Sequence, residues 1–250
     1  MHHPLLLLAA AGLLAGGMNA IAGGGSFVTF PAMVFAGLAP VIANASSTVA
    51  LFPGTLASTW AYRRELTGTV DIRLRWMLPA SIAGGLCGAL LLLFTPEHLF
   101  DIVIPWLLLL ATLTFAFGAQ AGAALRRVVR IGPVTLLVVQ FVISLYGGYF
   151  GGAVGLMMLG AWGLLTASVN VKAMAPARTL LVSAANGAAV LLFIGSGVVR
   201  WPDTLALLAG AVAGGYGGAH VARRLPPVLV RAIVLLLTAT ITAVFFRRAF

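Results

Sequence analysis

Long runs of apolar residues, separated by short charged or Pro/Gly-rich stretches, constrain this chain more than any other feature. A spanning helix needs about 20 apolar residues, because the hydrocarbon core of a bilayer is about 30 Å thick. Only 8% of the 250 residues are charged and 61% are apolar, which leaves too little polar surface for a water-soluble globule. We therefore predict an all-α integral membrane protein. Its eight apolar segments are 4–37, 41–62, 74–95, 99–118, 134–168, 173–196, 204–222 and 228–246.

Two of these segments, 4–37 and 134–168, are too long to cross the membrane once as straight helices. Each would measure about 50 Å, against about 30 Å of hydrocarbon. Both contain glycines, which are Gly16-Gly17 and Gly23-Gly24-Gly25 in the first segment, and Gly147-Gly148, Gly151-Gly152 and Gly155 in the second. We predict that each segment is broken or re-entrant at its glycine cluster. Unwound backbone is tolerated in a membrane only where it faces protein or a watery cavity, so both breaks should face inward.

The two halves of the chain are similar to each other at an offset of 130 or 131 residues. Residues 83–89 (AGGLCGA) fall on residues 213–219 (AGGYGGA) with five identities, and the two overlong segments fall in the same register. Duplicated halves with paired broken helices are typical of secondary transporters, whose substrate site lies between the halves. We therefore predict two repeats of about four helical segments each, 1–125 and 126–250, within one membrane domain.

The distribution of basic residues does not decide between inverted and parallel repeats. If all eight segments cross once, ten basic residues lie on one side and four on the other; if the two glycine-rich segments are re-entrant, the numbers are eleven and three. Since basic residues concentrate in the cytoplasm, both versions place the loop 63–75 there. Re-entrant segments commonly accompany inverted repeats, which we prefer for that reason. A cleaved signal peptide at the N-terminus, with a core at 5–14, is left open as an alternative.

The polar residues within the apolar segments suit an anion better than a cation. All five carboxylates lie in loops or in the first turns of segments, so no mid-span acid is available to a cation. Arg178 lies within an apolar run and either contacts an anion or extends to the interface. Glycine loops before half-helices present unpaired N–H groups to an oxyanion. The candidate substrate-binding residues are Asn19, Gly23, Gly24, Gly25, Ser26, Asn44, Ser46, Ser47, Thr48, Gly151, Gly152, Gly155, Arg178, Thr179, Ser183 and Asn186.

Structural roles are the alternative for many polar and small residues. Small residues let helices approach closely in lipid, and we prefer this role for the glycines within 84–88 and 214–218. Ser and Thr hydroxyls in a helix often donate to the backbone one turn earlier. The single cysteine and the scattered histidines form no metal-ligand pattern, so we predict no metal, no cofactor and no enzyme activity. The basic residues are explained by membrane topology, and we predict no nucleic-acid partner.

Several short motifs follow one another in both halves and together resemble a known family. In the first half they are 22–26 (AGGGS) with Pro31, 46–48 (SST), 62–64 (YRR) and 68–74 (GTVDIRL); in the second they are 147–155, 172–173 (KA) and 186–187 (NG). This set is similar to that of the TauE/SafE sulfite exporter family over nearly the whole chain. The resemblance implies a multi-pass permease of the plasma membrane, the inner membrane in bacteria, that exports sulfite, sulfonates or related small anions. Uptake of the same anions, a non-transporting membrane subunit and a homodimer are left open.

Overall fold

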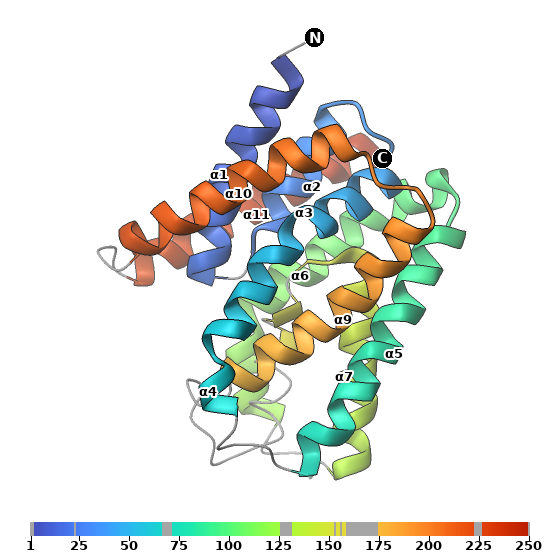
Figure 1. Cartoon of the computed structure of the whole chain (residues 1–250), viewed down its shortest axis with the longest axis vertical. Coiled ribbons are helices and arrows are strands. Elements are labelled where there is room, and N and C mark those ends of the chain that lie inside the picture. The colour runs from blue at the N-terminus through green and yellow to red at the C-terminus, as the bar shows by residue number, and fades with distance from the viewer. Residues whose placement is uncertain are drawn as a thin grey trace.

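The computed structural model of this chain describes residues 3–22, 24–66, 72–125, 132–152, 154–155, 157–158, 175–222 and 227–249 (Figure 1). The helices are α1 (His3–Ala22), α2 (Ser26–Phe35), α3 (Pro40–Ala61), α4 (Arg63–Leu66), α5 (Ile72–Phe94), α6 (Glu97–Leu125), α7 (Pro133–Phe150), α9 (Ala175–Gly195), α10 (Trp201–Ala222) and α11 (Pro227–Ala249). All regular secondary structure in these ranges is helical, as predicted, and the remaining residues form turns and loops between the helices. Gly23 of the predicted site lies outside the described residues.

Three described helices are long and apolar enough to cross a membrane, at Leu74–Phe94, Glu97–Thr114 and Pro176–Gly195. The shorter apolar helices are Pro4–Asn19, Ser26–Phe35 and Val134–Phe150. Large apolar side chains are exposed on the outer faces, for example Leu91 and Leu191. Such faces are costly in water and suited to lipid, so the chain is an integral membrane protein.

The two glycine-rich segments do not form single long helices in the described residues. α1 ends at Ala22 and α2 begins at Ser26, while α7 ends at Phe150. However, the earlier glycines of each cluster lie inside helices: a Cβ atom at Gly16 would overlap the carbonyl oxygen of Ala211, and one at Gly148 would overlap that of Gly85. These earlier glycines therefore serve close helix packing, and only the later glycines lie at helix ends.

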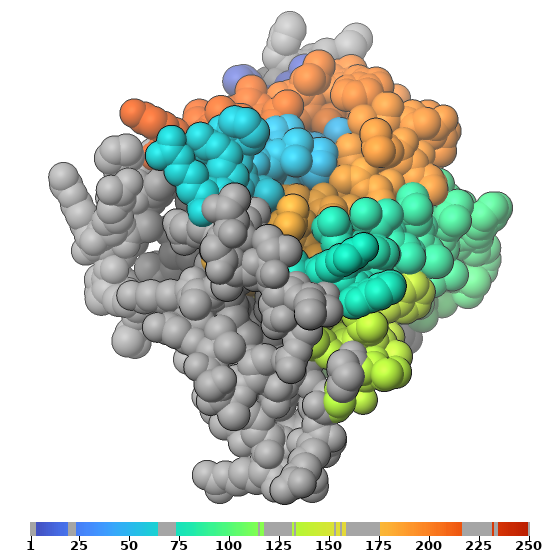
Figure 2. All heavy atoms as spheres, turned by 60° about the horizontal axis from the view of Figure 1, so that its bottom comes forward, coloured from blue at the N-terminus to red at the C-terminus, as the bar shows by residue number. Residues whose placement is uncertain are grey.

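Two helix pairs join the predicted halves, because α1 packs along α10 and α5 packs along α7. A Cβ atom at Gly214 would overlap the carbonyl oxygen of Leu13, and one at Gly88 would overlap that of Leu145. The packing role predicted for these two glycines is confirmed. Figure 2 shows the second pair from the end near α4, with the green surface of α5 beside the yellow-green surface of α7. Each pair contains one helix from each half.

The largest buried side chains gather where α2, α3, α6 and α9 meet. They include Phe27, Phe30 and Met33 of α2, Phe100 of α6 and Phe193 of α9. In lipid such contacts stabilise a helix bundle through van der Waals packing. This core surrounds the first half of α3, in which residues 43–50 are all buried. The polar residues of that stretch are consequently enclosed by protein.

A methyl group at Gly214 should destabilise the helix bundle. Gly214→Ala places a carbon atom against the backbone of Leu13, and overpacking of this kind costs about 1–3 kcal/mol. Gly195→Ala is the matched control, because a Cβ atom at Gly195 has no neighbour within 4 Å. We expect a lower melting temperature in detergent for Gly214→Ala and little change for Gly195→Ala. Equal melting temperatures would contradict the close packing of α1 and α10.

Candidate functional site

α2 begins with backbone N–H groups that have no acceptor. The N–H groups of Phe27 and Val28 donate to the carbonyl oxygens of Gly24 (3.2 Å) and Gly25 (3.0 Å). No side chain caps the helix at Gly25, and within the described residues the N–H groups of Gly25 and Ser26 have no hydrogen-bond acceptor. Gly24 and Gly25 are buried and Ser26 is partly buried. The start of α2 thus presents unpaired donors and the positive end of a helix dipole inside the protein.

The end of α7 lies against the starts of α2 and α3. Gly151 has a φ of 74°, in the left-handed region that favours glycine, and its N–H donates to the carbonyl oxygen of Gly147 (2.7 Å). A Cβ atom at Gly151 would lie 2.7 Å from Oγ1 of Thr48, and one at Gly152 would lie 3.5 Å from Oγ of Ser26. Gly151 and Gly152 therefore lie against Thr48 of α3 and Ser26 at the start of α2.

The side chains on one face of the polar run in α3 hold α2 and α7 in place. Nδ2 of Asn44 donates to the carbonyl oxygen of Tyr149 (2.8 Å), and Oγ1 of Thr48 donates to the carbonyl oxygen of Asn44 (2.9 Å). Oγ of Ser47 lies 2.5 Å from Oγ1 of Thr29 in α2. Asn44, Ser47 and Thr48 are all buried. Their direct contacts are with the two glycine-bearing helix ends.

Three other predicted residues contact helices away from this junction. Oγ of Ser46 accepts a hydrogen bond from the N–H of Arg200 (2.9 Å), immediately before α10. Oγ of Ser183 lies 2.7 Å from Oγ1 of Thr59. The hydroxyl of Thr59 also donates to the carbonyl oxygen of Thr179 (3.1 Å). Ser46 thus joins α3 to α10, and Thr179 and Ser183 join α9 to α3.

Arg178 and Asn186 lie on one face of α9, about two turns apart. A Cβ atom at Gly155 would lie 3.8 Å from Cδ of Arg178 and 3.9 Å from Cγ2 of Val182, so residue 155 adjoins this face. Arg178 is partly buried, and no carboxylate among the described residues forms an ion pair with it. Asn186 is 8% exposed, and its buried Oδ1 has no hydrogen-bond partner. An unpaired buried polar atom costs about 1–3 kcal/mol, which a bound solute or water offsets.

Asn19 lies beside the start of α2. A Cβ atom added at Gly25 would be 3.3 Å from Cβ of Asn19, and a Cβ atom added at Gly54 would be 3.9 Å from its Nδ2. Sequence reasoning missed Thr29 and Tyr149. Thr29 follows Gly25 by one helical turn, so the period of α2 was the signal that could have identified it. Tyr149 contributes only its carbonyl oxygen to Asn44, and backbone groups give no residue-specific signal.

A second buried polar cluster, also missed, joins α5 to α7. Nε2 of Gln140 donates to Oγ of Ser81 (2.8 Å) and to Oγ of Ser144 (3.3 Å), and it lies 3.8 Å from the sulfur of Met158. All four side chains are fully buried. The cluster therefore holds Met158 against α7. Met158 lies three residues beyond Gly155 in the sequence.

Apolar helices that enclose a polar junction of two helix ends, beside an arginine with no carboxylate partner among the described residues, are the arrangement expected of a membrane transporter. The family model described as "Sulfite exporter TauE/SafE" matches residues 8–245. The chain therefore belongs to the TauE/SafE sulfite exporter family, and the resemblance inferred from its motifs is confirmed.

The curated relatives are named as transporters. The chain is 29% identical to the "Probable membrane transporter protein YfcA" of Escherichia coli (strain K12), over 97% of this chain and 90% of that protein. It is 27% identical to a "Probable membrane transporter protein" of Haemophilus influenzae, over 96% of this chain and 93% of that protein. No solved structure matches the chain. The protein is a membrane transporter of this family.

A methyl group at Gly151 should disturb the junction more than an equivalent change elsewhere. Gly151 and Gly197 share nearly the same φ, 74° and 73°, so replacement by Ala costs each about 1–2 kcal/mol in backbone strain. Only at Gly151 does the new methyl meet a neighbour, Oγ1 of Thr48, whereas the space around Gly197 is open. We expect Gly151→Ala to lower the melting temperature more than Gly197→Ala does. In a Thr48→Ala background, most of this difference between the two glycine variants should disappear. Equal losses for the two glycines would contradict the observed contact.

Proposed function

We propose that this transporter moves small anions and holds each anion where the two glycine-bearing helix ends meet. The observation that carries the proposal is the unpaired N–H groups of Gly25 and Ser26, which lie beside Gly152 inside the protein. Helix N-termini of this kind bind oxyanions without a full opposing charge. Arg178, without a carboxylate partner among the described residues, supplies the positive charge on α9.

Hydroxyl groups contribute less to this site than their number suggests. The hydroxyls of Thr48 and Thr179 donate to the carbonyl oxygens of Asn44 and Pro176 in their own helices. A hydroxyl has one hydrogen, so these side chains have none left for an anion. The donors that we propose for the substrate are the N–H groups at the start of α2 and Arg178, whereas the unpaired Oδ1 of Asn186 is an acceptor and suits water or a protonated solute oxygen.

The two halves, 1–125 and 126–250, are proposed to be inverted repeats. Thr112 and Thr242 are 130 residues apart and their Oγ1 atoms lie 3.2 Å from each other. A contact between equivalent residues occurs at a twofold axis. Equivalent helices also run antiparallel: α6 and α11 pair Trp106 with Phe246 (5.2 Å between ring centroids) and Asp101 with Arg248. Antiparallel equivalents support a twofold axis in the membrane plane.

The order of helix ends supports the re-entrant version of the topology. The N–H of Val41 donates to Oε2 of Glu97 (3.3 Å), so the starts of α3 and α6 lie together, and the end of α11 lies beside Asp101. Oγ of Ser46, near the start of α3, accepts a hydrogen bond from the N–H of Arg200, so the start of α10 lies on the same side. In this version the three basic residues Arg200, Arg247 and Arg248 lie on that side and eleven lie on the other. The positive-inside rule then assigns the larger set to the cytoplasm of a bacterial inner membrane.

The substrate class is proposed to be sulfite or a related organosulfur anion, carried outward. The description of the family model names sulfite export, and a single cationic side chain suits a small oxyanion. An inside-negative potential drives a monovalent anion outward by about 2.3 kcal/mol per 100 mV. Export by uniport is therefore feasible without a dedicated proton carrier.

Flux measurements in proteoliposomes test this proposal. We expect labelled sulfite and short sulfonates to leave vesicles that contain the wild-type protein, and an inside-negative potential to accelerate their release. Cations of similar size serve as the control and should not be carried. Equal release from protein-free vesicles would contradict transport of this anion class, and insensitivity to the potential would contradict uniport.

Removal of the charge at Arg178 should abolish anion flux without loss of folded protein. Arg178→Gln keeps a polar side chain of similar length, whereas Arg178→Lys keeps the charge and should retain part of the flux. Arg63→Gln is the matched control, because Arg63 is exposed and stacks on Trp60 with its guanidinium 4.4 Å from the ring centroid. Wild-type flux in Arg178→Gln would remove Arg178 from the site.

A further inference from the structure

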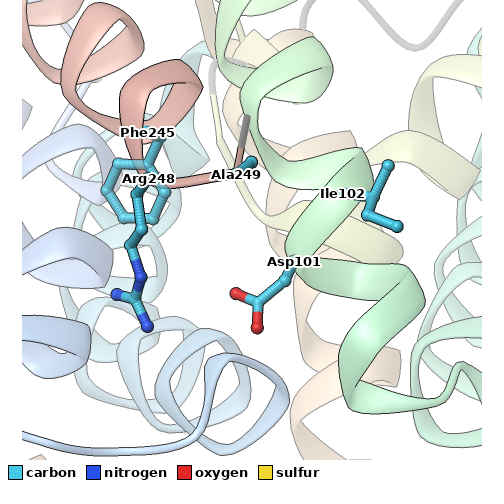
Figure 3. A pocket seen from close by; sticks show the side chains of 5 residues that line it. All are labelled: Asp101, Ile102, Phe245, Arg248 and Ala249. Carbon is cyan, nitrogen blue, oxygen red and sulfur yellow. The ribbon is translucent and has the colours of Figure 1, made fainter.

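A small pocket opens between the start of α6 and the end of α11, on the side away from α4. It has a volume of about 150 Å³ and is lined by Asp101, Ile102, Phe245, Arg248 and Ala249. Figure 3 shows the carboxylate of Asp101 and the guanidinium of Arg248 facing each other across it. These two groups form no ion pair within the described structure. One comes from the first half of the chain and the other from the second.

A cluster of aromatic rings forms the floor of this pocket. The ring of Phe245 lies 5.6 Å from that of Phe30, which lies 5.6 Å from that of Phe150 and 6.5 Å from that of Phe100. Phe100 in turn lies 5.5 Å from Tyr149. Phe30 is 1% exposed and Phe100 is fully buried. The rings of this cluster are therefore packed against one another inside the protein.

These ring contacts lead from the pocket, which Phe245 lines, to residues next to the candidate site. Phe30 directly follows Thr29, whose hydroxyl contacts Ser47, and Phe150 directly precedes Gly151, which contacts Thr48. The start of α2 therefore contributes the ring of Phe30, and the end of α7 contributes those of Tyr149 and Phe150. Since Phe30 and Phe100 belong to the first half and Phe150 and Phe245 to the second, a movement of one half against the other must separate the rings.

We infer that the aromatic cluster is a closed gate, that it opens when α6 and α11 move apart, and that the anion passes between Asp101 and Arg248. The inference rests on the proposed transport function and adds the route by which the substrate leaves. Arg248 is the cationic group nearest the outer face of the gate, and Asp101 faces it across the opening. Apolar constrictions of this kind close a pathway by excluding water.

A reversible tether between α6 and α11 tests the gate. In a Cys87→Ser background, which removes the single native thiol, Trp106→Cys in α6 and Phe246→Cys in α11 are joined by a short bis-methanethiosulfonate reagent after reconstitution. The rings of these two residues lie 5.2 Å apart, and the proposed route does not use them. The protein is folded and assayed before the tether forms, so loss of flux cannot come from misfolding. We expect the tether to reduce anion flux to the level of protein-free vesicles, and a reductant to restore it.

The matched control joins two cysteines on the same side of the protein at the start of α10, so that its tether does not link two helices. Arg200 and Asp203 form an ion pair in which Nε and Oδ2 are 3.4 Å apart, so Arg200→Cys and Asp203→Cys accept the same reagent. This tether should leave flux unchanged. Undiminished flux through the tethered Trp106→Cys/Phe246→Cys protein would overturn the gate. Absence of anion flux in the untethered wild type would instead contradict the proposed function.

Discussion

Backbone hydrogen bonding in a medium without water is the constraint on which this structure depends. Lipid offers no partner to an N–H or C=O group, so every lipid-facing stretch must be helical. The described exceptions are informative: α2 starts and α7 ends inside the protein, against the buried part of α3. Irregular backbone is tolerated there because protein covers it, and the same cover buries the N–H groups that we propose as donors to the anion. One requirement thus accounts for the helical exterior and for the polar interior.

Close helix packing then brings the two helix ends together. Glycines let the backbones of α1 and α10, and of α5 and α7, approach until a Cβ atom would overlap a carbonyl oxygen. Since each pair takes one helix from each half, neither half can be packed without the other. The helix ends that carry Ser26 and Gly151 are consequently fixed against each other by contacts far from the site itself. Asn44, through Tyr149, adds a direct bond between α3 and α7.

The same arrangement explains how a closed pathway and a binding site can lie side by side. Thr29 and Phe30 are neighbours in α2, and Phe150 and Gly151 are neighbours at the end of α7. At both helix ends a polar or glycine position faces the junction and the adjacent residue places a ring in the aromatic cluster. A small shift of either helix end would therefore move residues of the proposed binding site and rings of the proposed gate together.

Sequence alone determined the helical class, the membrane setting and the family, because hydrophobic length and glycine placement act locally and leave a pattern in the chain. It also singled out Gly24, Gly151 and Arg178 as candidates, since glycine clusters and a mid-span charge are conspicuous in an apolar background. It could not separate Gly16 or Gly148, which pack inside helices, from Gly151, which ends one, because both roles use the same residue type. Nor could it decide that Ser46 contacts α10 while Ser47 contacts α2, since neighbouring residues of a helix point about 100° apart and only the partner helices define the faces. The tertiary structure made those choices, because they depend on which distant segment lies within hydrogen-bond reach.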